Sequence, residues 1–445
     1  RFIMGFQQGL SGLGASSRAL DVISSNVANS GTVGFKSSSA VFADSFASAM
    51  TGGVSNLQVG MGGNTLAIRQ SFTQGATTAT NNPLDMAIAG NGFFEVKRNN
   101  DSIAYSRNGQ FDLDKDGYIV NSLGERLQGY QTLNLDGSVS FLGSTTPRSI
   151  LVPPEGISAK ATGGGDANAD SIPDGDPLSI RGNLDASATA PDPVATPFSS
   201  GDPNSYNYTT SATVYDSLGK DHNVSMYFVK SDPAVTPNEW DVYVTFDGVD
   251  LLAPNTPDST VPNRIGFRSS DGAFDATLST GIPIAMLVDT TTLGSGAAPL
   301  LFDIDLTGFT QHSSDSTVFE ISQDGSPPGE LAGVSVSSSG VVEGRYTNGE
   351  TRELAQVVLV TFRNPNGLVS LGDNLWAESG DSGQPVVGAP GAGLNGTIGS
   401  GRVEESNVDM SAELVNMIIQ QRNYQANAQS IKTQDQILQT LINLR

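Results

Sequence analysis

The end of the chain carries one strict hydrophobic spacing, which constrains the fold more than any other feature. Ten positions succeed one another at alternating steps of four and three residues, and eight of them are apolar. These positions are Met410, Leu414, Met417, Gln421, Tyr424, Ala428, Ile431, Asp435, Leu438 and Ile442. Such alternation is typical of a coiled-coil seam, which is narrower than the apolar face of a globular helix. We expect a long helix here, with Ser411 as its N-cap and Asp409 favouring its start.

The beginning of the chain repeats this alternation. Its positions are Phe6, Leu10, Leu13, Ser17, Leu20, Ser24 and Val27. The small serine side chains allow helices to approach closely. Periodicity alone leaves two interpretations open: two ordinary helices inside one globular domain, or helices that pack against copies of themselves. Their position at the two ends of the chain favours the second interpretation.

The middle of the chain is predicted to be β structure. Runs of alternating and β-branched residues, bounded by Gly, Asn, Asp and Pro, indicate strands at Ala87–Val96, Val224–Val229 and Trp240–Phe246. A Gly-Asn-Gly turn interrupts the first of these runs. The expected fold is therefore multidomain, α plus all-β. Terminal helices form a coiled-coil-like inner domain, and nested β-sandwich or barrel-like domains lie outside it.

The order of these runs predicts three nested domains, which agrees with a prior of ~150 residues per domain. Residues 1–70 and 403–445 form the terminal helical domain with a connecting segment. Residues 71–146 and 322–402 form a discontinuous β domain, and residues 147–321, richer in Pro, Asp, Gly and Thr, form an inserted outer β domain.

The charge is divided in the same way. The whole chain carries a net charge of −23, of which residues 1–70 contribute +2 and residues 402–445 contribute −1, so residues 71–401 carry −24. Nearly neutral ends can pack densely against each other, whereas an acidic middle suits a solvated exterior. The chain has no basic patch for nucleic acid.

Composition excludes several classes of protein. Cysteine is absent, which excludes disulfides, thiolate metal sites and cysteine-dependent cross-links between subunits. Two histidines, His222 and His312, are too few for a typical hydrolase or zinc site. No apolar run approaches the ~20 residues of a membrane helix. The first residues lack the basic region and apolar core of a secretory signal peptide.

Two motifs imitate ligand sites. Residues 112–118 place acids and a glycine as in the first half of a calcium loop, but Leu123 stands where the loop needs a bidentate Glu, so we expect a turn. Residues 391–396 match a bare dinucleotide pattern with no βαβ unit around it. We therefore expect no catalytic residue, no cofactor and no metal.

Several segments as a set are similar to the terminal and inner signatures of the axial proteins of the bacterial flagellum, the family of rod, hook and filament-junction proteins. These segments are Val27–Lys36, Ala89–Phe94, Leu127–Tyr130, Glu405–Asp409 and Gln420–Ala428. Gln323–Leu331, Val341–Thr347 and Thr361–Leu368 resemble the hook members of that family. The resemblance covers roughly the first 145 and last 125 residues well.

The resemblance implies a structural subunit of the flagellar hook, an extracellular flexible tube acting as a universal joint that transmits torque from the basal-body rod to the filament. It implies export without a cleaved signal peptide, and a connecting segment at Ala40–Leu66 that becomes ordered on assembly. The implied partners are further copies of the chain, the distal rod protein, the hook cap, the hook–filament junction protein and the flagellar export apparatus, with no nucleic acid and no membrane insertion. The alternatives are a distal rod subunit of the basal body and, less favoured, a calcium-binding extracellular adhesin.

The residues expected to build the inner tube come from both ends of the chain. They are Leu10, Leu13, Leu20, Val27, Asn29, Phe35, Met410, Leu414, Met417, Tyr424, Ile431, Leu438 and Ile442.

Overall fold

The structure is a computed structural model that forms two compact units. It describes residues 2–44, 62–133, 139–140, 146–154, 156–164, 175–192, 194–232, 234, 236–250, 263–294 and 296–443. Unit 1 comprises residues 1–154, 332–345 and 351–445, and unit 2 comprises residues 155–331 and 346–350.

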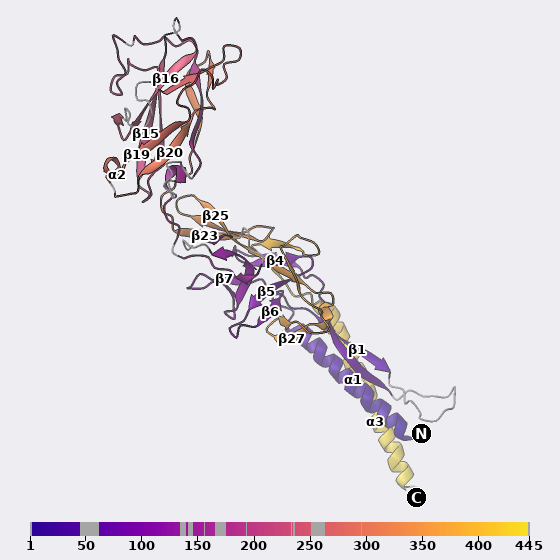
Figure 1. The fold of residues 1–445 in the computed structure, drawn as a ribbon. Helices are drawn as coiled ribbons and strands as arrows, with labels where there is room; N and C mark the ends of the chain where they lie inside the picture. Colours follow the sequence, from indigo (N-terminus) through magenta and orange to yellow (C-terminus); the bar gives the residue numbers. More distant parts are fainter. Residues whose placement is uncertain are drawn as a thin grey trace. The chain divides into compact units, whose positions relative to one another are not determined.

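Two long helices dominate one part of unit 1. Helix α1 spans Phe2–Ala28, helix α3 spans Met410–Asn443, and the two lie side by side with both chain ends at the same end of the pair (Figure 1). The pair is therefore antiparallel. Helix α3 begins at Met410 because the Asp409 carboxylate accepts a hydrogen bond from the Ala412 amide at 3.1 Å. Asp409 is the N-cap, so the prediction of Ser411 is wrong by two positions.

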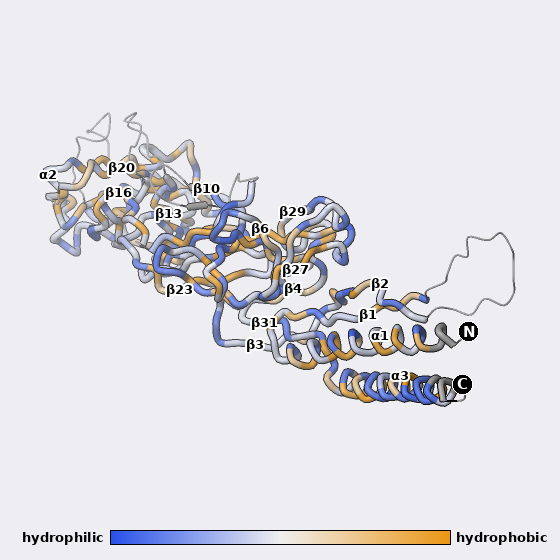
Figure 2. The backbone as a smooth tube through the Cα atoms, turned by 90° about the horizontal axis from the view of Figure 1, so that it is seen from below, coloured by the Kyte–Doolittle hydropathy of each residue, from blue (hydrophilic) through white to orange (hydrophobic). Residues whose placement is uncertain are grey.

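A β-hairpin runs along helix α1 (Figures 1 and 2). Strand β1 (Ser38–Asp44) pairs antiparallel with β2 (Gly63–Gln70). These strands contain the two ends of the predicted connecting segment. Residues 45–61 lie outside the described residues.

The rest of unit 1 is built on a thirteen-stranded sheet, called here the β body. Its main path runs β23 (Leu331–Val336), β24 (Val341–Tyr346), β25 (Thr351–Val357), β9 (Arg126–Tyr130), β5 (Phe93–Lys97), β6 (Ile103–Ser106), β28 (Leu375–Ala377), β27 (Val369–Gly372). Off this path lie β7 (Phe111–Leu113), β8 (Ile119–Asn121), β12 (Arg148–Ser149), β26 (Leu359–Thr361) and β29 (Val386–Gly388). One of its buried clusters combines aromatic residues from strands distant in sequence, including Phe93, Tyr105 and Trp376.

Short two-stranded sheets accompany the β body. They pair β3 (Thr77–Ala79) with β31 (Arg402–Glu404), β4 (Met86–Ala89) with β30 (Thr397–Ser400), and β10 (Thr132–Leu133) with β11 (Val139–Ser140). A short 3-10 turn, η2 (Pro365–Gly367), precedes β27. The predicted Gly-Asn-Gly turn separates β4 from β5, and Gly90 and Gly92 adopt φ of 111° and 127° there.

Unit 2 is a β-sandwich. One five-stranded sheet contains β13 (Leu178–Asp185), β19 (Ile284–Val288), β20 (Leu300–Asp305), β21 (Thr310–His312) and β22 (Thr317–Ser322). The other contains β14 (Tyr208–Tyr215), β15 (Asp221–Lys230), β16 (Glu239–Phe246), β17 (Val249–Asp250) and β18 (Asn263–Gly266). Short helical turns lie at η1 (Thr162–Gly164) and α2 (Thr290–Leu293).

The strand alternation of unit 2 explains its core. In β15 every second residue from His222 to Lys230 is buried, as the period of a half-buried strand requires. Three of these side chains, Val224, Met226 and Phe228, join Trp240, Ile180 and Phe302 in one apolar cluster that draws on both sheets. Strands β15 and β16 confirm the predicted runs. The expected fold class, terminal helices that pack together combined with mostly β structure, is confirmed.

Candidate assembly surface and helix-base junction

Small residues lie on the buried side of α1. Gly9, Ser16 and Ala19 are buried in the unit. A Cβ placed on Gly9 would lie 2.8 Å from Cγ1 of Ile431, so the absence of a side chain sets how closely the two helices approach. Small residues therefore allow the helices to approach closely, as predicted, but Gly9 does so and not the predicted Ser17 and Ser24.

The predicted apolar positions of α1, such as Leu10, follow the buried small residues, such as Gly9, by one position. One residue rotates an α-helix by about 100°, so the predicted apolar positions point to the side of the face that contacts α3. Leu10 is 56% exposed, and Leu13, Leu20 and Val27 are half-buried. The predicted apolar period is therefore present, but it lies beside the face that contacts α3.

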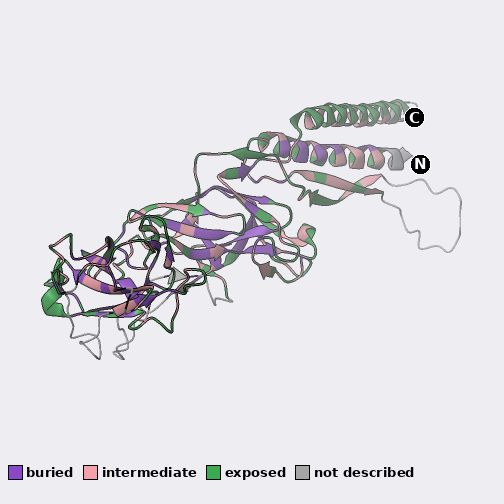
Figure 3. Ribbon diagram, turned by 90° about the horizontal axis from the view of Figure 1, so that it is seen from above, coloured by how far each residue is buried: buried purple, intermediate pink, exposed green. Residues whose placement is uncertain are grey.

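Helix α3 also leaves much of its apolar surface in water (Figures 2 and 3). Met417 and Ile431 are half-buried, and Tyr424 is 37% exposed. Met410 and Leu414 are 48% and 45% exposed. The side chains of Leu438 and Ile442 lie outside the described part of the helix.

Further exposed apolar residues of α3 extend this surface. They are Val415, Ile418, Ile419 and Ile437. We call the exposed apolar residues of α1 and α3 together the helix stripe: Phe6, Leu10, Met410, Leu414, Val415, Ile418, Ile419, Tyr424 and Ile437. Extended exposed apolar surface on a soluble protein marks an interaction site.

The other two predicted residues lie just beyond α1 rather than on the stripe. The Asn29 side chain donates to the Ser25 carbonyl at 2.9 Å and accepts from the Thr32 hydroxyl at 3.3 Å, closing the end of the helix. Phe35 is half-buried, and its carbonyl accepts from the Asn407 amide at 3.5 Å. Both residues therefore shape the junction at the base of the helices.

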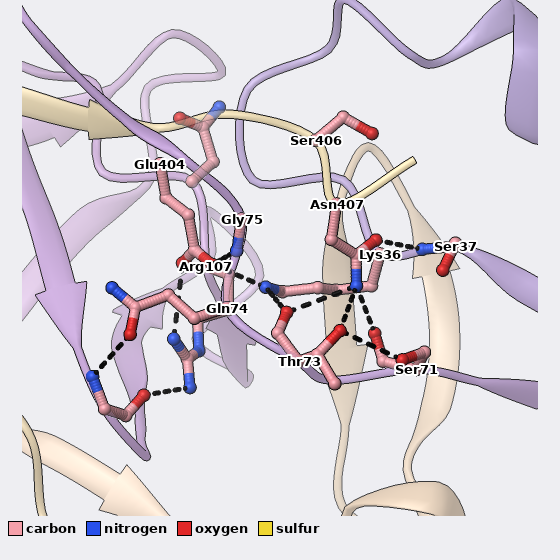
Figure 4. A network of polar contacts seen from close by, with 12 residues as sticks. Lys36, Ser37, Ser71, Thr73, Gln74, Gly75, Arg107, Glu404, Ser406 and Asn407 are labelled. Atoms are coloured by element: carbon pink, nitrogen blue, oxygen red, sulfur yellow. Dashed lines mark hydrogen bonds and ion pairs between the residues drawn. The ribbon is translucent and has the colours of Figure 1, made fainter. Parts of the chain in front are cut away.

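A buried carboxylate, Glu404, occupies the centre of this junction (Figure 4). Its Oε1 accepts from Lys36 Nζ at 2.6 Å and from the Gly75 amide at 2.8 Å. Its Oε2 accepts from Arg107 Nη1 at 3.2 Å. Lys36, Arg107 and Glu404 are 1%, 3% and 0% exposed, so this ion cluster is sealed from water.

Carbonyl groups complete the coordination of the two cations. Lys36 Nζ also donates to the Thr73 carbonyl at 2.7 Å, and Arg107 Nη2 donates to the Gly90 carbonyl at 2.9 Å. Burial lowers the pKa of Lys36 and of Arg107 below their ordinary values, because low-dielectric surroundings disfavour the charged forms, and Glu404 opposes both shifts. Glu404 thus carries the negative charge that makes two buried cations tolerable.

Two buried or bridging carboxamides extend the junction. Asn26 joins both helices and the hairpin, since its Nδ2 donates to the Ser38 carbonyl at 2.8 Å and to Glu413 Oε1 at 3.1 Å. Asn407 accepts from the Ser37 amide at 2.7 Å and donates to the Ser71 carbonyl at 2.8 Å. Both asparagines thereby satisfy backbone groups where the chain leaves regular structure.

One glycine of the junction has a steric requirement. Gly34 has φ of +72°, and a Cβ there would lie 2.6 Å from the Asn108 amide nitrogen. Its own amide donates to the Glu404 carbonyl at 2.7 Å. The turn between α1 and Lys36 therefore fits only a residue without a side chain.

The remaining motif of interest, residues 112–118, forms a turn between β7 and β8. Asp114 Oδ1 accepts from the amides of Asp116 and Tyr118 at 2.9 and 2.8 Å. Across the described residues, no group of three or more His, Cys, Asp or Glu is placed to hold a metal ion. None of the described helices combines the length and apolar character needed to cross a membrane.

Family sequence models match four segments of the chain. They are the flagella basal body rod protein over residues 6–36, the flagellar hook protein FlgE/F/G D1 domain over 87–166, the flagellar basal body protein FlaE D2 domain over 183–326, and the flagellar basal body rod FlgEFG protein C-terminal over 400–444. The flagellar hook protein FlgE of Escherichia coli (strain K12) is 40% identical over 444 residues, covering 99% of this chain and 100% of that protein. This chain belongs to the flagellar hook protein family.

Two other hook proteins are similar to this chain. The flagellar hook protein FlgE of Salmonella typhimurium (strain LT2) is 40% identical over 446 residues, covering 99% of this chain and 100% of that protein. The crystal structure of Helicobacter pylori flagellar hook protein FlgE2 aligns with a TM-score of 0.46 at 18% identity, covering 72% of this chain and 98% of that one. The predicted resemblance to the hook members of the axial family is confirmed by the sequence relatives.

The ion cluster joins three of these matched segments. Lys36 ends the first match, Arg107 lies in the second and Glu404 lies in the last. The segment that ends in Lys36 is part of the family resemblance, but no sequence pattern marks Arg107 or Glu404 as a partner of Lys36. The signal in the sequence is the presence of charged residues at these positions, and charge alone does not predict burial or pairing across hundreds of residues.

Proposed function

We propose that this flagellar hook protein polymerises through the helix stripe, so that α1 and α3 of many copies build an inner tube. The observation that carries the proposal is the exposed apolar surface of α3, which includes Leu414, Ile418 and Ile419. Burying a whole leucine side chain contributes about 1.5–3 kcal/mol, so covering its exposed half contributes about 1 kcal/mol. Several such contacts in every copy, repeated along a tube, favour assembly.

The β domains form the outer layers in this proposal. Residues 1–70 and 403–445 build the tube, residues 71–146 and 322–402 the next layer, and residues 147–321 the outermost layer. Outer contacts that can exchange between neighbours permit bending, while the dense inner tube carries torque from the basal-body rod to the filament. The function is structural, with no catalysis, and the chain is exported through the flagellar export apparatus. Its partners at the ends of the tube are the distal rod protein, the hook cap and the hook–filament junction protein.

Replacement of Leu414 by Asp tests the helix stripe. Leu414 is 45% exposed in the single chain, so the charge remains solvated in the monomer and the fold is retained. In the tube the same carboxylate would be buried without a partner, which costs several kcal/mol. We expect Leu414→Asp to abolish tube formation by purified protein in electron micrographs, while thermal unfolding of the β structure stays unchanged.

Asn416→Asp is the matched control, because this exposed residue of α3 lies outside the helix stripe and receives the same charge. Normal tubes from Asn416→Asp with none from Leu414→Asp support the proposal. Tubes from both variants would contradict it.

A further inference from the structure

We infer that the Glu404 carboxylate rigidly couples the helix pair to the β body, so that load on the helices reaches the β body through this group. Glu404 acts as a positioning residue. The inference that it transmits load rests on the proposed tube function. The segments that Glu404 joins, the burial of its carboxylate and the charge balance around it carry the inference.

Glu404 joins four segments that are far apart in the sequence (Figure 4). Lys36 lies between α1 and the hairpin, Gly75 follows the hairpin, and Arg107 follows β6 of the β body. Glu404 itself ends β31, six residues before α3 begins. Every route by which the chain passes between the helical part and the β body is therefore held by hydrogen bonds to one carboxylate.

Burial makes this connection stiff. Rotation of the helix pair against the β body would pull Lys36 or Arg107 away from Glu404 in a region where water cannot replace the lost contact. Attraction between opposite charges is much stronger at low effective dielectric than in water. A surface ion pair in the same place would exchange freely with solvent and resist rotation little.

The charge balance of the ion cluster makes removal of the Glu404 charge especially destabilising. Two cations face one carboxylate, so the cluster carries one net positive charge. Removal of the negative charge would leave Lys36 and Arg107 buried side by side with only carbonyl oxygens for partners. Breaking a buried ion pair from one side is far more disruptive than replacing the pair.

The decisive variant is Glu404→Gln, which keeps the size of the side chain and removes its charge. Amide hydrogen exchange of the full-length monomer is the first readout. We expect amides of residues 34–37 and 73–76 to exchange at least ten-fold faster, while strands β5 and β9 keep their wild-type protection. The control is Glu405→Gln, the same change at the adjacent exposed position.

The polymer supplies the second readout. We expect Glu404→Gln to form tubes, because the helix stripe is unchanged. In cryo-electron microscopy the inner tube should be well defined, whereas the density of the β body should be weak because its position varies between subunits. A failure of the proposed function would appear differently, as wild-type protein that forms no tube at all. Such a failure leaves the monomer exchange test of the coupling intact.

A double variant keeps the inference testable if Glu404→Gln fails to fold. Lys36→Met combined with Glu404→Gln leaves Arg107 alone and restores the wild-type net charge of the cluster. We expect this variant to fold and to remain uncoupled, with fast exchange at residues 73–76. Wild-type exchange at the helix base in either variant, or an equal loss of protection throughout the β body, would overturn the inference.

Discussion

Replacement of Gly9 by Ala tests whether the two helices are held at the spacing that the structure shows. In an exposed helix, Gly→Ala stabilises by about 1 kcal/mol because the unfolded chain loses conformational freedom. At Gly9 the new methyl group would lie 2.8 Å from Cγ1 of Ile431, well inside van der Waals contact. That atom is close to the α3 backbone, so the helices must separate or Ile431 must leave its rotamer.

Overpacking of this kind costs about 1–3 kcal/mol. The gain in helix propensity offsets about 1 kcal/mol of it, so we expect Gly9→Ala to destabilise the α1–α3 pair by up to about 2 kcal/mol. Gly14→Ala is the matched control, because no atom lies within 4 Å of a Cβ at that position. Gly14→Ala should therefore stabilise the pair by about 1 kcal/mol.

The assay is thermal depolymerisation of tubes, with hydrogen exchange of the α1 amides in the tubes as a second measure. Ile431→Ala should rescue Gly9→Ala by removing the atom that the methyl group meets, so the double variant should be more stable than additivity predicts. Equal stabilisation by Gly9→Ala and Gly14→Ala would refute the close approach of the helices.

Two further predictions concern dynamics and pH. We expect the amides of residues 411–440 to exchange rapidly in dilute monomer and slowly in tubes, because α3 is packed on one side only before other subunits bind to it. Strong protection in the monomer would contradict this. Burial raises the pKa of Asp247, but hydrogen bonds from His222 and the Asn223 amide outweigh it and hold that pKa below its ordinary value. A depressed carboxylate pKa stabilises the fold above the unfolded value of about 3.9, and this contribution is lost as pH falls through the lower folded pKa. The acid-unfolding midpoint of unit 2 should therefore depend on Asp247, and Asp247→Asn should reduce stability at pH 7 more than at pH 2 in a denaturant titration.

The sequence predicts the helices well but not which of their faces meet. The positions 9, 16 and 23 of α1 repeat with the same period as 10, 17 and 24, so periodicity cannot separate them. The structure places Gly9 against Ile431 of α3, buries Ser16 and leaves Leu10 exposed. A search for large apolar residues selects the leucines, because glycine and serine carry no hydrophobic signal.

The junction escapes prediction for a different reason. Glu404 and Lys36 are 368 residues apart, and no local pattern records a pairing over that distance. Within the neighbouring segments that resemble the flagellar family, the structure gives single residues a specific role. Gly34 supplies a left-handed turn, Asn407 closes backbone hydrogen bonds and Asp409 caps α3.

The unequal covering of the two helices has a genetic consequence. Helix α1 is covered by both α3 and the hairpin, whereas much of the apolar surface of α3 has no neighbour among the described residues. In a polymer of identical copies, one substitution on α3 alters every subunit contact of the tube at once. A compensating change elsewhere in the same gene is copied into every subunit too. Suppressors of α3 defects should therefore be recovered readily within this gene, at positions that are surface in the monomer.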